Sequence, residues 1–227
     1  MTVKNNKTVR KNQLKLLGLF AIVFVPMATA TSMYFGDWGI PTGSTNKGEL
    51  IWPPMSISDL NASDNQGQPL SRYFSLDEPD ARPLKWDMLT EEHSEEISES
   101  QWVLLVTGND VCNERCQQAL YTVRQVNTAL GKESERVFRV LASSAELGDS
   151  RTELTKQYPR LSLASMNTDD LKSFAKDHFE NIETVTNDWN IWVVDPLGNV
   201  ILRYEADRHG KDILKDMKRL LKLSNIG

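Results

Sequence analysis

The pattern of apolar and polar positions divides the chain into three kinds of segment. Residues 14–35 carry no charge apart from Lys15 and are mostly apolar. Residues 36–70 are rich in Gly, Pro, Ser and Asn and show no helical period, which predicts an extended linker with a short strand at ELIW. From residue 71 onward, apolar runs and amphipathic stretches predict a folded domain, and the pattern becomes regular from residue 101.

The regular part predicts alternating strands and helices. WVLLVTG is a continuous apolar run, typical of a strand buried on both faces. An apolar stripe of period 3.6 follows and predicts a helix with Asp110 as its N-cap and Gly131 at its end. RVFRVLAS and LSLAS predict further strands separated by a short helix at TELTKQY, and RYFSL and LKWDML predict strands earlier in the chain. After a helix in NTDDLKSFAKDHF, the segments WNIWVVD and NVILRYE flank PLG and predict a hairpin. The last predicted element is an amphipathic helix. Its apolar face is formed by Ile213, Leu214, Met217, Leu220 and Leu221.

This order of elements predicts a thioredoxin-like α/β sandwich preceded by one N-terminal transmembrane helix. A right-handed crossover makes the first two strands parallel neighbours, and the hairpin adds antiparallel strands. The expected organisation is a basic tail at 1–13, a membrane anchor at 14–35, the linker at 36–70 and the thioredoxin-like domain at 71–227.

The distribution of charge sets the expected topology. Of the 26 basic residues, five lie within residues 1–35, which hold no acidic residue, and this leaves 21 basic against 31 acidic residues in the remainder. An acidic domain disfavours nucleic acid as a partner. The positive-inside rule keeps the basic tail cytoplasmic and exports the domain. ATA at 28–30 resembles a signal-peptide cleavage site. However, the apolar run exceeds a signal peptide's usual apolar region, so an uncleaved anchor is favoured. Either interpretation places the domain where disulfides persist.

The two cysteines of the chain, Cys112 and Cys116, are the main chemical feature. A spacing of four residues places both on one face of the predicted helix, near its N-terminus, where the dipole stabilises a thiolate. Arg115 would add to this effect, whereas Asp110 and Glu114 would oppose it. Three roles stay open for the two cysteines: a redox pair, two ligands of a soft metal ion, and a structural disulfide. A structural disulfide would stabilise the fold only weakly, because the loop that it closes is so short.

Several quoted segments resemble a known family. The N-terminal anchor, WVLLVTG before the Cys-x3-Cys, and WNIWVVDPLGNVILRY are similar to the Sco family of membrane-anchored, thioredoxin-like proteins that serve cytochrome c oxidase assembly. TNKGELIWPP and KDILKDMKRLLKLSNIG resemble a divergent bacterial subgroup. The resemblance implies a single-pass protein of the bacterial inner membrane with a periplasmic domain. It implies an oxidase subunit or its copper chaperone as the partner.

The chain departs from the Sco pattern at one ligand. Sco proteins bind copper with two cysteines and a histidine eight residues before the hairpin aspartate, which here is Asp195, so that the ligand position is Asn187. An amide is a poor Cu(I) ligand, and His178 is the nearest substitute. The favoured function is therefore thiol–disulfide exchange by Cys112 and Cys116. The alternatives are a copper carrier that uses both cysteines with His178, and an adaptor that docks on the oxidase without catalysis.

Overall fold

We describe a computed structural model of the 227-residue chain, for residues 3–36, 45–74, 101–109, 111–144 and 150–224. The chain divides into two compact units, Met1–Thr45 and Asn46–Gly227. Each unit is described by itself. The predicted strand at LKWDML lies outside the described residues.

The N-terminal unit contains one long helix, α1 (Val3–Gly36). Its segment Val9–Gly36 has 28 residues and contains an 18-residue window with a mean hydropathy of 1.9, so it is long and apolar enough to cross a membrane. Its hydroxyl groups are satisfied within the helix, since Thr29 and Thr31 donate to the carbonyls of Val25 and Met27 at 2.7 and 2.8 Å. The predicted apolar run at 14–35 lies inside this segment.

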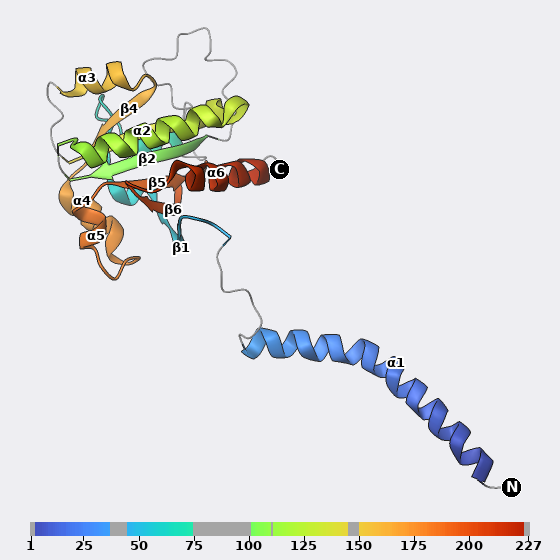
Figure 1. The fold of residues 1–227 in the computed structure, drawn as a ribbon. Coiled ribbons are helices and arrows are strands. Elements are labelled where there is room, and N and C mark those ends of the chain that lie inside the picture. The colour runs from blue at the N-terminus through green and yellow to red at the C-terminus, as the bar shows by residue number, and fades with distance from the viewer. Residues whose placement is uncertain (1–2, 37–44, 75–100, 110, 145–149, 225–227) are drawn as a thin grey trace. The chain divides into compact units, whose positions relative to one another are not determined.

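The second unit is built on one mixed sheet of six strands, in the order β1-β6-β5-β2-β3-β4 (Figure 1). β2 pairs parallel with β3 and β3 parallel with β4, whereas the β2–β5, β5–β6 and β1–β6 pairs are antiparallel. The predicted parallel crossover and the hairpin are thus confirmed. The strand bounds are β1 (Glu49–Ser56), β2 (Trp102–Gly108), β3 (Val137–Ser143), β4 (Leu161–Ser165), β5 (Asn190–Val194) and β6 (Asn199–Glu205).

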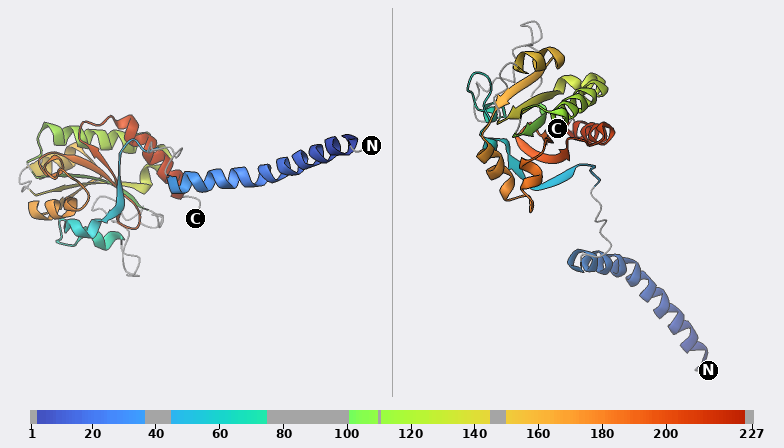
Figure 2. Two further views of the ribbon diagram at one scale, coloured as in Figure 1. Left: turned by 90° about the horizontal axis from the view of Figure 1, so that it is seen from below. Right: turned by 60° about the vertical axis from the view of Figure 1, so that its left-hand side comes forward.

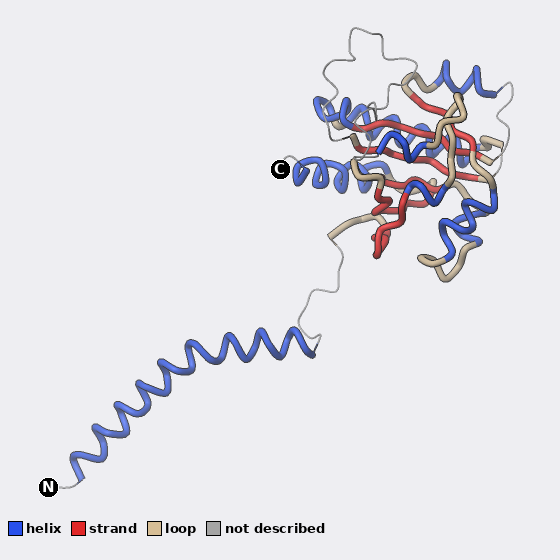
Figure 3. Tube along the Cα trace, turned by 180° about the vertical axis from the view of Figure 1, so that it is seen from behind, coloured by secondary structure: helices blue, strands red, loops and turns tan. Residues whose placement is uncertain are grey.

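Helices cover both faces of the sheet because alternate strand residues point in opposite directions. Leu104 and Val106 of β2 pack in a core with α2 (Glu114–Ala129), α3 (Ser150–Gln157) and α6 (Gly210–Ser224). The two layers of helices are visible in Figures 2 and 3.

The opposite face of the sheet forms a second core. Val103 and Leu105 point to this side, where they pack with α4 (Thr168–Lys176) and the short helix η1 (Ile57–Leu60). α5 (Glu183–Thr186) contributes Val185 to the same core. β2 is therefore buried on both faces, as its continuous apolar sequence predicted.

The segment assigned from sequence to a linker, 36–70, contributes the edge strand β1. The compact unit begins at Asn46, and Ile51 and Met55 of β1 are buried in the second core. Asp216 of α6 holds the start of this segment, because its Oδ2 accepts hydrogen bonds from the backbone N–H groups of Lys47 and Gly48 at 2.6 and 3.0 Å. The carboxylate also accepts a hydrogen bond from the Tyr204 hydroxyl at 2.8 Å.

The predicted strand at RYFSL is wrong for its first three residues. Residues Leu70–Phe74 form a short 3-10 helix, η2. The N–H of Arg72 bonds to the carbonyl of Pro69 at 3.1 Å, and the N–H of Leu70 bonds to the carbonyl of Ala62 at 2.8 Å. These backbone groups are used in local turns, so the apolar Leu70 is buried without entering the sheet.

Candidate functional site

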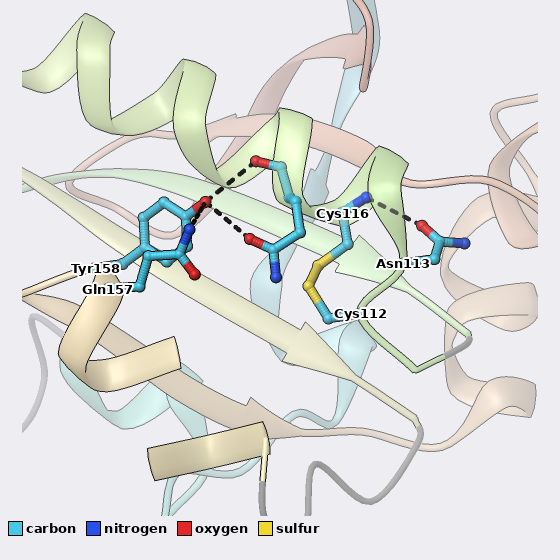
Figure 4. The surroundings of a disulfide bond; sticks show 6 residues. Cys112, Asn113, Cys116, Gln157 and Tyr158 are labelled. Atoms are coloured by element: carbon cyan, nitrogen blue, oxygen red, sulfur yellow. Dashed lines mark hydrogen bonds between the residues drawn. A yellow bond between two sulfur atoms is a disulfide. The ribbon is translucent and has the colours of Figure 1, made fainter. Parts of the chain in front are cut away.

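The two cysteines form a disulfide that joins the segment after β2 to the first turn of α2 (Figure 4). Their Cα atoms are 5.1 Å apart. Cys116 is fully buried, with an exposed fraction of 0%, whereas Cys112 is partly exposed. Cys112 is therefore the more exposed residue of the pair, whereas Cys116 faces the core under α2.

The start of α2 differs from the prediction. Asn113, not Asp110, is the N-cap, and its Oδ1 accepts a hydrogen bond from the N–H of Cys116 at 3.1 Å. Cys112 consequently lies before the helix rather than in its first turn, and Cys116 lies within the first turn. Asparagine is among the best N-cap residues, so the sequence did carry this signal at Asn113. A cap at Asp110 would have required the β-branched Val111 to begin the helix.

Packing below the disulfide follows the predicted apolar stripe. Cys116 belongs to the core with Ala119, Leu120 and Val123, and Cys112 packs against the edge of this core. Trp189, which precedes β5, belongs to the same core. A Cβ atom on Gly108 would lie 2.5 Å from the Trp189 ring, so the last residue of β2 has no room for a side chain. This close contact fixes the position at which the chain leaves β2 toward Cys112.

Arg115 does not act as the free cation that the sequence suggested. Its Nε and one terminal nitrogen donate to Oδ1 and Oδ2 of Asp188 at 2.6 and 2.5 Å, a two-point ion pair that joins the first turn of α2 to the segment before β5. A second link lies beside it, where Asn109 Nδ2 donates to the carbonyl of Thr186 at 2.7 Å. Asn187 lies between these two linked residues and is exposed. These two links therefore hold position 187 near the segment between β2 and α2, which contains Cys112.

The structure does not assemble the predicted set of Cys112, Cys116 and His178. His178 follows α4, which packs on the face of the sheet opposite to Cys116. Both of its ring nitrogens are buried and find no hydrogen-bond partner within the described ranges. Those ranges contain no group of three His, Cys, Asp or Glu side chains able to hold a metal ion. In the disulfide, moreover, neither sulfur is a thiolate, the form that binds a soft metal. With the disulfide closed, the described residues bring no third ligand to the two sulfurs.

Tyr158, which the sequence did not predict as part of the site, contacts the start of α2 (Figure 4). Tyr158 follows α3 and is buried, and its hydroxyl donates to Oε1 of Gln117 at 2.9 Å. Burial raises the pKa of Tyr158, and the nearby Arg124 lowers it. The contact joins the α3–β4 turn to the residue that follows Cys116. An aromatic residue at the end of a short polar helix gave no sign of this role in the sequence.

Two family models match the chain, one for each unit. The model of the transmembrane-like, thioredoxin-like C-terminal domain matches residues 102–224, more than half of the chain. The chain belongs to this family. The model of its transmembrane-like N-terminal domain matches residues 7–37, which include most of α1. Membership of the transmembrane-like, thioredoxin-like family confirms the predicted fold of the domain.

Solved structures with a similar fold have low sequence identity to the chain. Apo Sco1 from Thermus thermophilus is 16% identical, with 79% of this chain and 99% of that chain covered and a TM-score of 0.47. Copper-bound ScoI from Bradyrhizobium japonicum is 14% identical, with coverages of 76% and 98% and a TM-score of 0.43. A thiol:disulfide interchange protein from Bacteroides sp. is 13% identical, with coverages of 78% and 91% and a TM-score of 0.42. A search of curated proteins finds no match.

Proposed function

We propose that this protein is a membrane-anchored thiol–disulfide exchange protein in which Cys112 and Cys116 are the catalytic residues. The observation that carries the proposal is the unequal burial of the pair, since Cys112 is partly exposed and Cys116 is fully buried. A partner sulfur can reach only the exposed member of such a pair. The position at the end of a buried strand and the start of a helix also supports this chemistry.

The exchange proceeds through a mixed disulfide with Cys112. A thiolate of the partner attacks the Cys112 sulfur, the Cys112–Cys116 bond breaks, and Cys116 leaves as a thiolate in the first turn of α2, where the helix dipole favours a negative charge. The second partner thiolate then attacks the partner sulfur of the mixed disulfide and releases Cys112. Two electrons and two protons pass from the partner dithiol to the cysteine pair. The reverse direction begins with attack by the Cys112 thiolate.

The setting of this reaction follows from the resemblance to Sco proteins and from the charge distribution. We infer that residues 14–35 anchor the protein in a bacterial inner membrane, with the basic tail at 1–13 in the cytoplasm and the domain in the periplasm. The partner would be a cysteine pair of a cytochrome c oxidase subunit or of its copper chaperone. Copper binding by the unmodified chain is not part of the proposal, because Asn187 supplies an amide where a Cu(I) ligand is needed.

Trapping of the mixed disulfide tests the assignment of the two cysteines. The reduced full chain in detergent micelles is mixed with an activated peptide disulfide, and adducts are measured by mass spectrometry. Cys116→Ser is expected to accumulate a stable adduct on Cys112, because the resolving thiol is absent. Cys112→Ser is expected to react far more slowly, since its one thiol is buried. Equal adduct formation by both variants would show that the pair has no exposed attacking member.

A cellular test separates exchange from a docking role. The double variant Cys112→Ser/Cys116→Ser is expressed in place of the wild-type protein, and oxidase assembly is followed by the content of its copper centre. Exchange predicts that the double variant fails to support assembly although it accumulates normally in the membrane. Assembly at the wild-type level would favour an adaptor that needs neither thiol.

A further inference from the structure

Three arginines converge on the turn between α3 and β4. Arg124 of α2 donates to the carbonyl of Gln157 at 2.9 Å, and Arg139 of β3 donates to the carbonyl of Pro159 at 2.5 Å. Arg160 is the next residue of the same turn and adopts a φ of 63°, a conformation that glycine would adopt more easily. The side chains of a helix, a strand and a turn thus bring three positive charges to one place.

None of the three arginines forms an ion pair among the described residues. Arg139 is only 5% exposed, and no ion pair of the described ranges includes Arg124, Arg139 or Arg160. Burial, followed by repulsion from Arg124 and Arg160, lowers the pKa of Arg139 to about 10. A buried charge is costly unless it is paired. The chain after residue 35 is acidic, so its average composition does not explain three unpaired arginines side by side.

The cluster is structurally connected to the disulfide. Arg124 follows Cys116 by eight residues on α2, which corresponds to about 12 Å along the helix axis. Tyr158, from the same turn, is hydrogen-bonded to Gln117 at 2.9 Å, so the turn is fixed against the start of α2. Tyr121 is 55% exposed and lies one helical turn before Arg124 on the same face of α2. An extended peptide of a few residues could reach from Cys112 across Tyr121 to the arginines.

We propose that Arg124 and Arg160, which are exposed, bind carboxylate side chains of the partner protein in an acidic segment that flanks its reactive cysteine, and that the buried Arg139 adds positive charge behind them. Guanidinium groups bind carboxylates through paired hydrogen bonds, and two exposed arginines beside a buried one offer several donors to such a segment. The inference rests on the proposed exchange function for its choice of partner. It adds that the partner is recognised by charge as well as by its cysteines.

Direct binding tests the inference without any redox step. A fluorescent peptide of four glutamates without cysteine is titrated with the full chain in uncharged detergent, and fluorescence anisotropy is measured at low salt. A peptide with four glutamines is the matched ligand. We expect the glutamate peptide to bind at least tenfold more tightly, and the double variant Arg124→Gln/Arg160→Gln to lose about tenfold of that affinity. Arg219→Gln, an exposed arginine of α6, is the charge-matched control and should bind as the wild type does.

A second measurement distinguishes failure of this inference from failure of the exchange function. Exchange with 2-hydroxyethyl disulfide, a small uncharged substrate, should be the same in the wild type and in Arg124→Gln/Arg160→Gln. Equal binding of both peptides, or no effect of the double variant, would overturn the inference even where exchange with the small disulfide proceeds. Loss of all exchange with preserved binding of the glutamate peptide would overturn only the proposed function. Inorganic phosphate that displaces the peptide at micromolar concentration would reassign the cluster to a small oxyanion and also overturn the inference.

Discussion

Reduction of the Cys112–Cys116 disulfide is expected to leave the domain folded. The bond joins residues four apart in the sequence, so it closes a very short loop. A cross-link stabilises a fold mainly by restricting the unfolded chain, and the chain-entropy relation gives about 2 kcal/mol for so short a loop. A domain of this size is stable by roughly 5–15 kcal/mol. The reduced form therefore keeps most of its stability, as a protein that alternates between two redox states requires.

Thermal unfolding of the oxidised and reduced full chain measures this difference. For a domain of 150–250 residues, a loss of 2 kcal/mol corresponds to a fall in Tm of roughly 4–8 °C. The reduced sample contains a phosphine reductant, and tryptophan fluorescence follows unfolding of the domain. The Cys112→Ser/Cys116→Ser variant is the control, since its Tm should match that of the reduced protein and should not respond to reductant.

Two results would refute the reasoning. Unfolding of the domain on reduction at 25 °C would show that the disulfide is needed for the fold. Each cycle of thiol–disulfide exchange would then unfold the domain. An increase in Tm on reduction would mean that the bond distorts the folded state, so that the chain-entropy argument omits the main effect. Agreement between the reduced protein and the double variant is needed for either conclusion.

Three further substitutions test particular contacts. Arg139→Met should raise the free energy of unfolding by about 1–2 kcal/mol in urea titrations, because it removes a charge whose burial costs on the order of 3 kcal/mol while leaving the Pro159 carbonyl without its donor. This gain should shrink above pH 10, where the folded wild type can release the proton, and a destabilised variant would contradict it. Asp216→Ala should cost about 3–5 kcal/mol in the same assay, because the buried donors of Gly48 and Tyr204 and the partly buried N–H of Lys47 lose their acceptor, whereas Lys215→Ala should cost almost nothing. Asn187→His should raise the Cu(I) affinity of the reduced protein at least tenfold in anaerobic competition with a chelator. Asn187→Gln should not, and equal affinities would place position 187 away from the sulfurs.

The sheet and its helices were predictable because their signals are local. The strands at Trp102–Gly108 and Val137–Ser143 are continuous apolar runs, and the hairpin at 190–205 has a turn sequence between two such runs. β1 was harder to predict, since its prolines and exposed residues resemble a linker and only its pairing with β6 makes it a strand. Pairing between residues as far apart as Glu49 and Arg203 leaves no trace in local periodicity.

The site was predictable in its chemistry but not in its geometry. The spacing of Cys112 and Cys116 predicted that both sulfurs lie together at the start of a helix, but it did not show that Cys112 would precede the helix or that only Cys116 would be fully buried. The role of Arg115 depended on Asp188, a residue 73 positions away, and no sequence pattern announces that pair. His178 was considered a ligand because it is near position 187 in the sequence, although α4 places it on the other face of the sheet.

Partner selection would depend on two features, which are the unequal burial of Cys112 and Cys116 and the three arginines without an ion pair. An exchange reaction at one exposed sulfur offers little specificity, because any accessible thiolate can attack it. Arg139→Met is expected to make the fold more stable, because the buried guanidinium has no ion pair among the described residues. The neighbouring Tyr158–Gln117 contact fixes the arginine cluster relative to the disulfide. Charge recognition at the cluster would then hold an acidic partner long enough for its thiolate to reach Cys112. An Arg139→Met protein that is more stable, exchanges normally with small disulfides and discriminates poorly between acidic and neutral peptides would show this division of roles directly.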